Sequence, residues 1–283
     1  MRHLLVAPLL ALLACSSAGQ GNTDAGQIQA MCFLPVDGGV FVNGLPSPVP
    51  GCTASPGPVG ELDLKALGWA PLGGVLVVPE GAAAGTAVPV VFVFHGAGDT
   101  GADARDVFQL EDAGAGPAIF VYPNDAQGTW DIRPLSADGR QVDTLLGRLS
   151  TTYCIDPQRI YIAGFSAGAV FTLYLGCNVP ATFRALAAVA GTNTRFSPEC
   201  CKGPVSSLFI HGTADDTIPI DDGRLARSAA LVRDGCDANP LPDDANCVQY
   251  SCPAPYAVSY CEWPGGHAVP SWGGAEISRF FGL

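Results

Sequence analysis

The 283-residue sequence has few basic side chains, and only Lys65 and Lys202 are lysines. Lysine and arginine together number 14 against 26 aspartates and glutamates, which gives a net charge of -12. A protein that binds the phosphate backbone of a nucleic acid needs a surplus of positive charge. The composition therefore argues against nucleic acid as a partner, and an acidic surface fits an extracytoplasmic protein.

The apolar run at the start of the chain, within MRHLLVAPLLALLAC, is too short to span a bilayer. Its basic start and apolar centre are typical of a secretory signal. The run ends in Leu-Leu-Ala-Cys, which resembles the bacterial lipobox. We therefore expect residues 1–14 to be a signal peptide, Cys15 to be lipidated, and residues 15–29 to form a flexible tether. The alternative is a plain secretory signal with a cysteine nearby. In either case the protein is expected outside the cytoplasm, secreted or held to the cell envelope only by lipid.

Cys-X-X-Cys pairs and cysteines interleaved with histidines are both missing, so the sequence has no zinc-site pattern. We expect no metal and no organic cofactor. Removing Cys15 from the 11 cysteines leaves ten, an even number that favours disulfides in an exported chain.

The cysteine spacing suggests only local pairings. Cys32 and Cys52 could staple a Pro- and Gly-rich lead-in, and a turn through residues 253–255 could bring Cys252 to Cys261. Cys154 is a candidate partner for Cys177, with Cys200 and Cys201 as competitors.

Strand and helix patterns alternate from residue 88 onward, which predicts an α/β fold with a mainly parallel sheet and helices on both faces. Apolar, β-branched runs predict strands at residues 74–78, 88–94, 118–122, 160–163, 186–190 and 207–210. Helices are expected over residues 103–110, 141–149, 167–175 and 224–232. No low-complexity divider follows residue 60, so residues 30–283 are predicted to form one domain.

Gly164, Ser166 and Gly168 form a Gly-X-Ser-X-Gly pattern between a predicted strand and a predicted helix. A sharp strand-to-helix turn needs a strained residue at its tip and no bulky side chains beside it. The pattern predicts that Ser166 is held above the sheet edge as a nucleophile. The alternative is an ordinary Gly/Ser turn.

A serine hydroxyl needs a base to take its proton. His3 lies in the predicted signal, and His95 and His211 end strands, where we expect structural hydrogen bonds. His267 follows the last predicted strand in the glycine-bearing segment WPGGH, from which an imidazole can reach back over the sheet. His267 is therefore the predicted base.

The base needs an acid to orient it, and if the chain follows the α/β-hydrolase order, this acid lies between the serine and the histidine. Asp215 and Asp216 follow the strand at residues 207–210. Asp215 is our candidate and Asp216 the alternative; a turn or capping role is the other interpretation of both.

Acyl transfer also needs donors for the developing oxyanion. The backbone N–H of Ala167 is predicted to be one. The other is placed on Ala97, with Gly96 as the alternative, because His-Gly-Ala-Gly follows the strand at residues 88–94. A tight strand-to-helix turn without this role is the other interpretation.

Four motifs occur in order in the chain: VVFVFHGAGDTGAD, CIDPQRIYIAGFSAGAVFTLYLGC, LFIHGTADDTIPI and CVQYSCPAPYAVSYCEWPGGHAVP. Over residues 70–272 they resemble the α/β-hydrolase esterases that include feruloyl esterases, acetylxylan esterases and polyhydroxybutyrate depolymerases. The resemblance implies a disulfide-stapled α/β-hydrolase fold and a serine carboxylic ester hydrolase with Ser166, Asp215 and His267 as its triad. Trp130 resembles a family aromatic near the cleft, which implies substrate binding; a core or rim tryptophan is the alternative.

The chain departs from this family at two positions near the expected pocket. Val269 stands where the family usually has an aromatic, and Ala97 where it often has a cysteine or a second glycine. We expect a monomer that acts on feruloyl or acetyl esters of plant polysaccharide. A polyhydroxyalkanoate depolymerase, a serine peptidase and a non-catalytic surface-binding lipoprotein are the alternatives.

Overall fold

The computed structural model describes residues 57–84, 87–114, 116–242 and 246–283. These residues all belong to the compact unit Pro35–Leu283. The expected signal peptide, the tether with Cys15, and the expected Cys32 to Cys52 staple lie outside the described residues. Within the described ranges, no helix is both long and apolar enough to cross a membrane.

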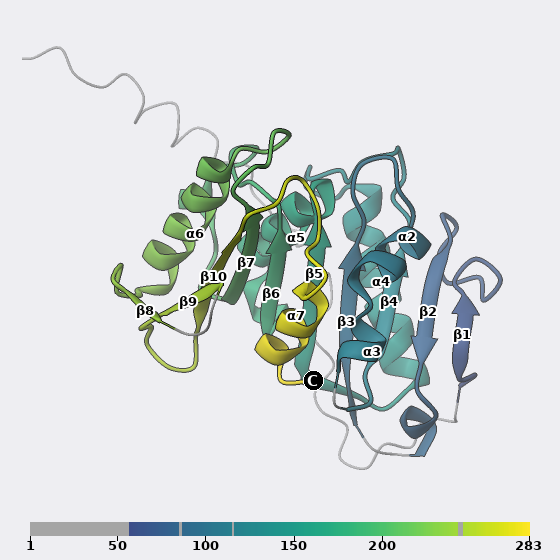
Figure 1. Ribbon diagram of the computed structural model, residues 1–283. Helices are drawn as coiled ribbons and strands as arrows, with labels where there is room; N and C mark the ends of the chain where they lie inside the picture. The colour runs from purple at the N-terminus through teal and green to yellow at the C-terminus, as the bar shows by residue number, and fades with distance from the viewer. Residues whose placement is uncertain (1–56, 85–86, 115, 243–245) are drawn as a thin grey trace, which may run out of the picture. The chain divides into compact units, whose positions relative to one another are not determined.

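A ten-stranded sheet forms the centre of this unit, and its strands are labelled in Figure 1. The strands are β1 (Gly60–Asp63), β2 (Gly74–Val78), β3 (Val88–Phe94), β4 (Ile119–Pro123), β5 (Ile155–Phe165), β6 (Ala185–Val189), β7 (Ser206–Gly212), β8 (Pro240–Pro242), β9 (Cys247–Tyr250) and β10 (Val258–Trp263). Their spatial order is β1-β2-β4-β3-β5-β6-β7-β10-β9-β8.

The middle of the sheet, from β4 to β10, is parallel, and the strands outside it are antiparallel. The predicted mainly parallel sheet is therefore confirmed. The strands β2 and β3 follow each other in the chain but do not pair, because β4 lies between them. All seven positions of β3 are buried, as is typical of a parallel strand covered on both faces.

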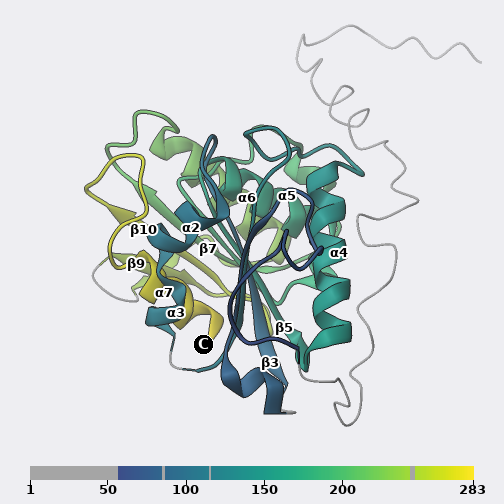
Figure 2. The ribbon, with the colours of Figure 1, turned by 90° about the vertical axis from the view of Figure 1, so that its right-hand side faces the viewer.

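Helices cover both faces of the sheet. They are α2 (Gly101–Phe108), α3 (Leu110–Ala113), α4 (Ala137–Thr152), α5 (Ala167–Asn178), α6 (Ile220–Asp234) and α7 (Gly273–Phe281), with short 3-10 turns η1 (Glu80–Ala84), η2 (Pro180–Thr182) and η3 (Pro198–Cys200). Figure 2 shows α4, α5 and α6 on one side of the sheet and α2, α3 and α7 on the other. Sequence reasoning missed α7, although Ile277 and Phe281 lie four positions apart and are both buried.

The alternation of side chains along β3 explains these two layers. Phe92 and Phe94 belong to the hydrophobic core under α4, α5 and α6. Val91 and Val93 belong to the separate core under α2 and α7. Successive residues of a strand point to opposite faces, so one apolar strand supplies both cores.

Three disulfides connect described cysteines, and they correct the expected pairings. The bonds are Cys177–Cys201, Cys236–Cys252 and Cys247–Cys261. Both Cys154 and Cys200 are disulfide-bonded as well. The expected bridge between Cys252 and Cys261 is wrong because Cys261 faces Cys247 on the neighbouring antiparallel strand. The candidate pair of Cys154 and Cys177 is wrong, and its competitor Cys201 is the partner of Cys177.

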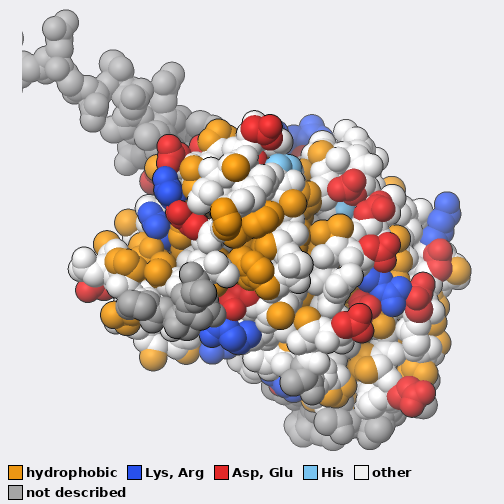
Figure 3. Space-filling model, in the orientation of Figure 1, with side chains coloured by type: hydrophobic (Ala, Val, Ile, Leu, Met, Phe, Trp, Pro, Cys, Tyr) orange, Lys and Arg blue, Asp and Glu red, His pale blue; other side chains and the backbone are white. Residues whose placement is uncertain are grey.

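Acidic side chains are spread over the face of the molecule seen in Figure 3 rather than gathered in one patch. Several of the arginines are paired with them: Arg105 with Glu111, Arg224 with Glu262, and Arg233 with Asp234. These ion pairs neutralise part of the positive charge, of which the chain has little.

Candidate active site

Ser166 lies at a sharp turn between β5 and α5. Its backbone has φ 53° and ψ -117°, outside the helical and extended regions. Such a conformation costs about 1–3 kcal/mol for a residue other than glycine, and it is held here by the elements on either side. The Ser166 N–H donates to the carbonyl of Val189 in the neighbouring strand β6 at 3.0 Å. The side chain is thereby presented beyond the carboxyl end of the sheet.

The glycines beside Ser166 allow α5 to pack against the sheet. A Cβ atom on Gly164 would lie 2.3 Å from the carbonyl oxygen of Gly168, and one on Gly168 would lie 2.2 Å from the carbonyl oxygen of Phe94. Real Cβ atoms do not approach backbone this closely. The Gly-X-Ser-X-Gly pattern is therefore a requirement of close backbone packing at this turn.

His267 lies in the loop after β10, and this loop is tied to the loop after β7. The Thr213 N–H donates to the carbonyl of Trp263 at 2.8 Å, and the Ala214 N–H donates to the carbonyl of Gly265 at 2.9 Å. These two bonds hold the loop that carries Asp215 against the loop that carries His267, which brings the two side chains together. They are 52 positions apart in the sequence.

The three predicted residues form a continuous chain of hydrogen bonds. The Nε2 atom of His267 lies 2.8 Å from the Oγ atom of Ser166. Its Nδ1 atom lies 2.9 Å from the Oδ2 atom of Asp215. A carboxylate only accepts, so Nδ1 carries the hydrogen and Nε2 is free to accept the serine proton. The ring of Phe165 lies against the His267 ring at a centroid distance of 4.9 Å, which restrains its orientation.

The Asp215 carboxylate is buried and well supplied with donors. Burial alone would raise its pKa, but hydrogen bonds from His267 and from the N–H groups of Ile218 and Thr217 outweigh burial and lower the pKa below its usual value. Asp215 is therefore ionised at neutral pH. Asp216, the alternative acid, is exposed, and its carboxylate accepts from the Thr217 hydroxyl.

The predicted oxyanion donors lie on two segments that pack against each other. Ala167 is the first residue of α5, where a backbone N–H has no acceptor within the helix. Ala97 lies in the turn closed by the Asp99 N–H donating to the carbonyl of Gly96 at 3.3 Å. Gly168 packs against the backbone of Phe94 and His95, so this turn lies beside the start of α5.

Trp130 is 5% exposed and lies in the core under α4, α5 and α6. Its ring stacks on Phe171 at a centroid distance of 5.0 Å, and its Nε1–H donates to the carbonyl of His95 at 2.9 Å. This burial leaves no open face for stacking on a substrate. Trp130 instead supports the loop that carries Ala97, in line with the core alternative.

Sequence reasoning missed a contact of His211. The imidazole was expected to make a structural bond, and its Nε2 atom does lie 2.8 Å from the carbonyl oxygen of Ile218. The same atom also lies 3.4 Å from the Oδ2 atom of Asp215. The motif His-Gly-X-X-Asp, with the histidine at a strand end, was the available signal.

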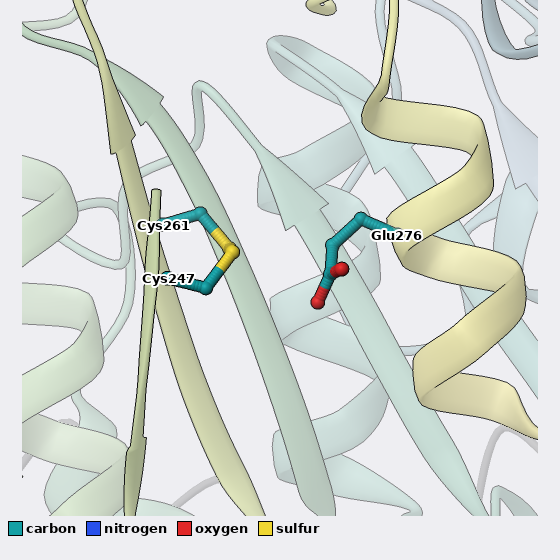
Figure 4. Close-up of side chains that lie close together, drawn as sticks. All are labelled: Cys247, Cys261 and Glu276. Atoms are coloured by element: carbon teal, nitrogen blue, oxygen red, sulfur yellow. A yellow bond between two sulfur atoms is a disulfide. The ribbon is translucent and has the colours of Figure 1, made fainter. Parts of the chain in front are cut away.

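The described residues contain one group of three side chains with metal-ligand atoms close together: Cys247, Cys261 and Glu276, within 4.8 Å of one another. Figure 4 shows the two sulfurs joined to each other and Glu276 reaching toward them from α7. Neither sulfur is a thiolate in this state, and Glu276 pairs with Arg279 at 2.6 Å. The group is a disulfide beside an ion pair.

Comparisons with known proteins find esterases among the similar sequences and structures. Residues 136–245 match the model of the Phospholipase/Carboxylesterase family. A probable feruloyl esterase C from Aspergillus terreus is 27% identical over 209 residues, which cover 68% of this chain and 75% of the relative. Feruloyl esterase C from Emericella nidulans is 26% identical over 206 residues, with the same coverage. The solved structure of an acetyl xylan esterase from Aspergillus awamori is 18% identical to this chain. The match covers 79% of this chain and 99% of the esterase chain, with a TM-score of 0.59.

Proposed function

The chain is a carboxylic ester hydrolase of the α/β-hydrolase fold, and we propose that it acts through an acyl-enzyme formed on Ser166, with His267 as base and Asp215 as the orienting acid. The observation that carries this proposal is the unbroken hydrogen-bond chain from Ser166 through His267 to Asp215. A surface-binding protein has no need of that arrangement. The paired acid and base on a strained serine are what nucleophilic catalysis requires.

In acylation, the Oγ atom of Ser166 attacks the ester carbonyl carbon while its proton passes to Nε2 of His267. The carbonyl oxygen becomes an oxyanion, and the C–O bond to the alcohol then breaks. The same proton passes from His267 to the departing alcohol oxygen. Asp215 stays ionised and stabilises the imidazolium that exists between these two transfers.

In deacylation, water takes the place of the alcohol. His267 removes a proton from the water as its oxygen attacks the acyl carbon, and it returns the proton to Oγ of Ser166 as the acid leaves. The backbone N–H groups of Ala167 and Ala97 are the proposed donors to the oxyanion in both steps, with Gly96 as the alternative to Ala97. No metal or organic cofactor takes part in this scheme.

The proposed substrates are feruloyl or acetyl esters of plant polysaccharide. The names of the fungal relatives support the feruloyl ester, and the sequence motifs resemble those of feruloyl and acetylxylan esterases alike. The chain is proposed to act as a monomer.

Release of hydroxycinnamate and acetate from feruloylated and acetylated xylan tests the substrate class. The purified protein should release one of these acids, and Ser166→Ala should release neither. Hydrolysis of short hydroxyalkanoate oligomers without release from xylan would move the substrate to polyesters. Cleavage of peptide amides in preference to all these esters would contradict the esterase proposal.

We also propose that the protein is exported and held to the cell envelope by lipid on Cys15. The apolar run ending in Leu-Leu-Ala-Cys supports this. Cells making the full chain should retain the protein in the detergent phase of a phase-separating detergent, and Cys15→Ser should move it to the aqueous phase. Aqueous partitioning of both forms would contradict lipidation and favour a plain secretory signal.

A further inference from the structure

Asp215 is flanked by two imidazoles rather than one. The Nδ1 atom of His267 lies 2.9 Å from its Oδ2 atom, and the Nε2 atom of His211 lies 3.4 Å from the same oxygen. His211 is 2% exposed and lies near the end of β7. The proposed mechanism assigns no role to His211, although His211 lies beside Oδ2 of Asp215, the oxygen that accepts from His267.

The hydrogen on His211 can be assigned from its other neighbour. The Nε2 atom also lies 2.8 Å from the carbonyl oxygen of Ile218, and a carbonyl oxygen only accepts. The Nε2 atom therefore carries the hydrogen and donates it to the Ile218 carbonyl. The Asp215 carboxylate lies 3.4 Å from the same nitrogen, which is an electrostatic contact beside that hydrogen bond.

The start of α6 holds the ring in this orientation. A Cβ atom on Gly223 would lie 2.3 Å from the Nδ1 atom of His211, so the imidazole packs directly against the helix backbone. The Ile218 carbonyl that accepts from the same ring lies just before α6. Contact on one edge and a hydrogen bond on the other leave the ring little freedom to rotate.

The donors around Asp215 divide between its two oxygens. The N–H groups of Thr217 and Ile218 donate to Oδ1 at 3.0 Å and 2.9 Å. The two imidazoles face Oδ2. An ionised carboxylate has about four acceptor sites, so Oδ2 has room for the approach of His211 beside its hydrogen bond from His267.

We propose that His211 is a positioning residue for the catalytic acid, an inference that rests on the proposed function of this site. Its N–H donates to the Ile218 carbonyl and lies 3.4 Å from Oδ2 of Asp215. Through this electrostatic contact it keeps Oδ2 in line with Nδ1 of His267 and takes up part of the negative charge on that oxygen. Loss of the donor has two effects. The carboxylate is held less firmly, which lowers the rate, and it becomes a stronger partner for imidazolium, which makes His267 protonate at higher pH.

The pH effect must be separated from other charges near His211. The titratable and charged groups that lie near His211 in its own turn and on the elements packed against it are Asp215 and Asp216 after β7, Glu262 on β10, His267 after β10, and Asp222 and Arg224 on α6. Glu262 and Arg224 form an ion pair at 2.9 Å. None of these groups is changed in the variants below, so a shift in the pH profile reports the His211 contact.

The test compares His211→Phe, which keeps a ring but removes the donor, with His211→Gln, which keeps an N–H near the Nε2 position. Rates are expressed per active site from the p-nitrophenol burst of p-nitrophenyl acetate. In His211→Phe, kcat/KM should fall about tenfold or more, and the acid limb of its pH profile should move to higher pH. His211→Gln should recover most of the rate and of the limb position. Equal damage in both variants, or an unmoved limb with an unchanged kcat/KM in His211→Phe, would overturn the proposal.

Two further variants separate positioning from folding. Ser207→Ala removes a different buried donor from β7, a hydroxyl that donates to the carbonyl of Val205 and accepts from Arg233. Neither of these bonds involves Asp215. The variant should leave both kcat/KM per active site and the acid limb unchanged. Gly223→Ala keeps His211 but displaces its ring, and should reproduce the limb shift of His211→Phe. An acid limb at the wild-type pH in the Gly223→Ala profile would contradict the proposal.

A readout without substrate keeps the inference separate from the esterase proposal. The imidazole resonances of His267 are titrated by NMR in Ser166→Ala, with and without His211→Phe. The midpoint should rise when His211 is replaced, whatever ester the protein hydrolyses. If wild type and Ser166→Ala hydrolyse esters at the same background rate, the proposed function fails, whereas an unmoved NMR midpoint rejects the role of His211 alone.

Discussion

The Nε2 atom of His267 lies 2.8 Å from the Oγ atom of Ser166, although the two residues are 101 positions apart in the chain. The contact forms because β5 and β10 end at the same edge of the sheet and because the loop after β10 is bonded to the loop after β7. Ser166 is thus positioned by the bond from its N–H to the Val189 carbonyl, and His267 by the bonds between the loops after β7 and β10. The chemistry of the site depends on these two loops staying together.

Asp215→Asn tests the proposed acid of the triad. An asparagine can present its NH₂ group to Nδ1 of His267, which disfavours the tautomer in which Nε2 accepts the serine proton. We expect kcat to fall by about 10,000-fold, as seen when this acid is replaced in other triads. Steady-state kinetics with p-nitrophenyl butyrate measure the effect.

Asp216→Asn is the matched control for that change. Asp216 is exposed and its carboxylate contacts the Thr217 hydroxyl rather than His267. Its replacement should leave kcat within about twofold of wild type. A large loss in Asp216→Asn together with a small loss in Asp215→Asn would exchange the roles of the two residues.

The stability of the protein should depend on pH through Asp215. Hydrogen bonds hold the pKa of its carboxyl below the unfolded value of about 3.9. The unfolded chain therefore binds this proton more readily, so the group stabilises the folded state above that pH and loses its effect as the pH falls through the folded pKa. The difference in free energy of unfolding between wild type and Asp215→Asn, measured by urea denaturation, should shrink on acidification below about pH 4. A difference that grows on acidification would reverse the sign of this linkage.

Gly168→Ala should destabilise the turn at Ser166. The new Cβ atom would lie 2.2 Å from the carbonyl oxygen of Phe94, so α5 must move away from β3. A loss of about 2 kcal/mol or more in the free energy of unfolding is expected, with a loss of activity. Gly147→Ala is the control, because nothing lies within 4 Å of its Cβ position in α4. It should stabilise the protein by about 0.5–1 kcal/mol, and a similar result for both variants would contradict the packing argument.

Trp130→Phe separates a core role from a substrate-binding role. The change removes the N–H that donates to the carbonyl of His95 and opens space beside Phe171. We expect a loss of about 1–3 kcal/mol in the free energy of unfolding. The ratio of KM values for a feruloyl and an acetyl ester should stay at its wild-type value. A selective rise in KM for the feruloyl ester would restore Trp130 as a substrate contact.

The turn at Ser166 could be predicted because its signal is local. The strand, the two glycines and the helix are contiguous in the chain, and the close backbone approach that requires glycine occurs within this segment and at β3. The mainly parallel sheet followed from the alternation of strands and helices. The strand order was less accessible, since nothing in the residues of β2 and β3 indicates that β4 inserts between them.

Pairings between distant segments could not be predicted from spacing. Cys247 and Cys261 meet because β9 and β10 are antiparallel with these residues in register, and this register depends on tertiary structure. Trp130 presents the same difficulty, because the sequence around an aromatic residue in a loop does not show whether its ring faces solvent or the core. His211 was interpreted through its strand alone, whereas its contact with Asp215 arises from the turn after β7 and the start of α6.

The most direct test of the central claim is the pre-steady-state burst of p-nitrophenol from p-nitrophenyl acetate, with intact-mass analysis of the quenched protein. The acyl-enzyme account predicts a burst approaching one equivalent per protein and an added acetyl group that maps to Ser166. Ser166→Ala should show neither the burst nor the added mass. A linear time course with no acylated protein, at the same rate in wild type and Ser166→Ala, would contradict the account.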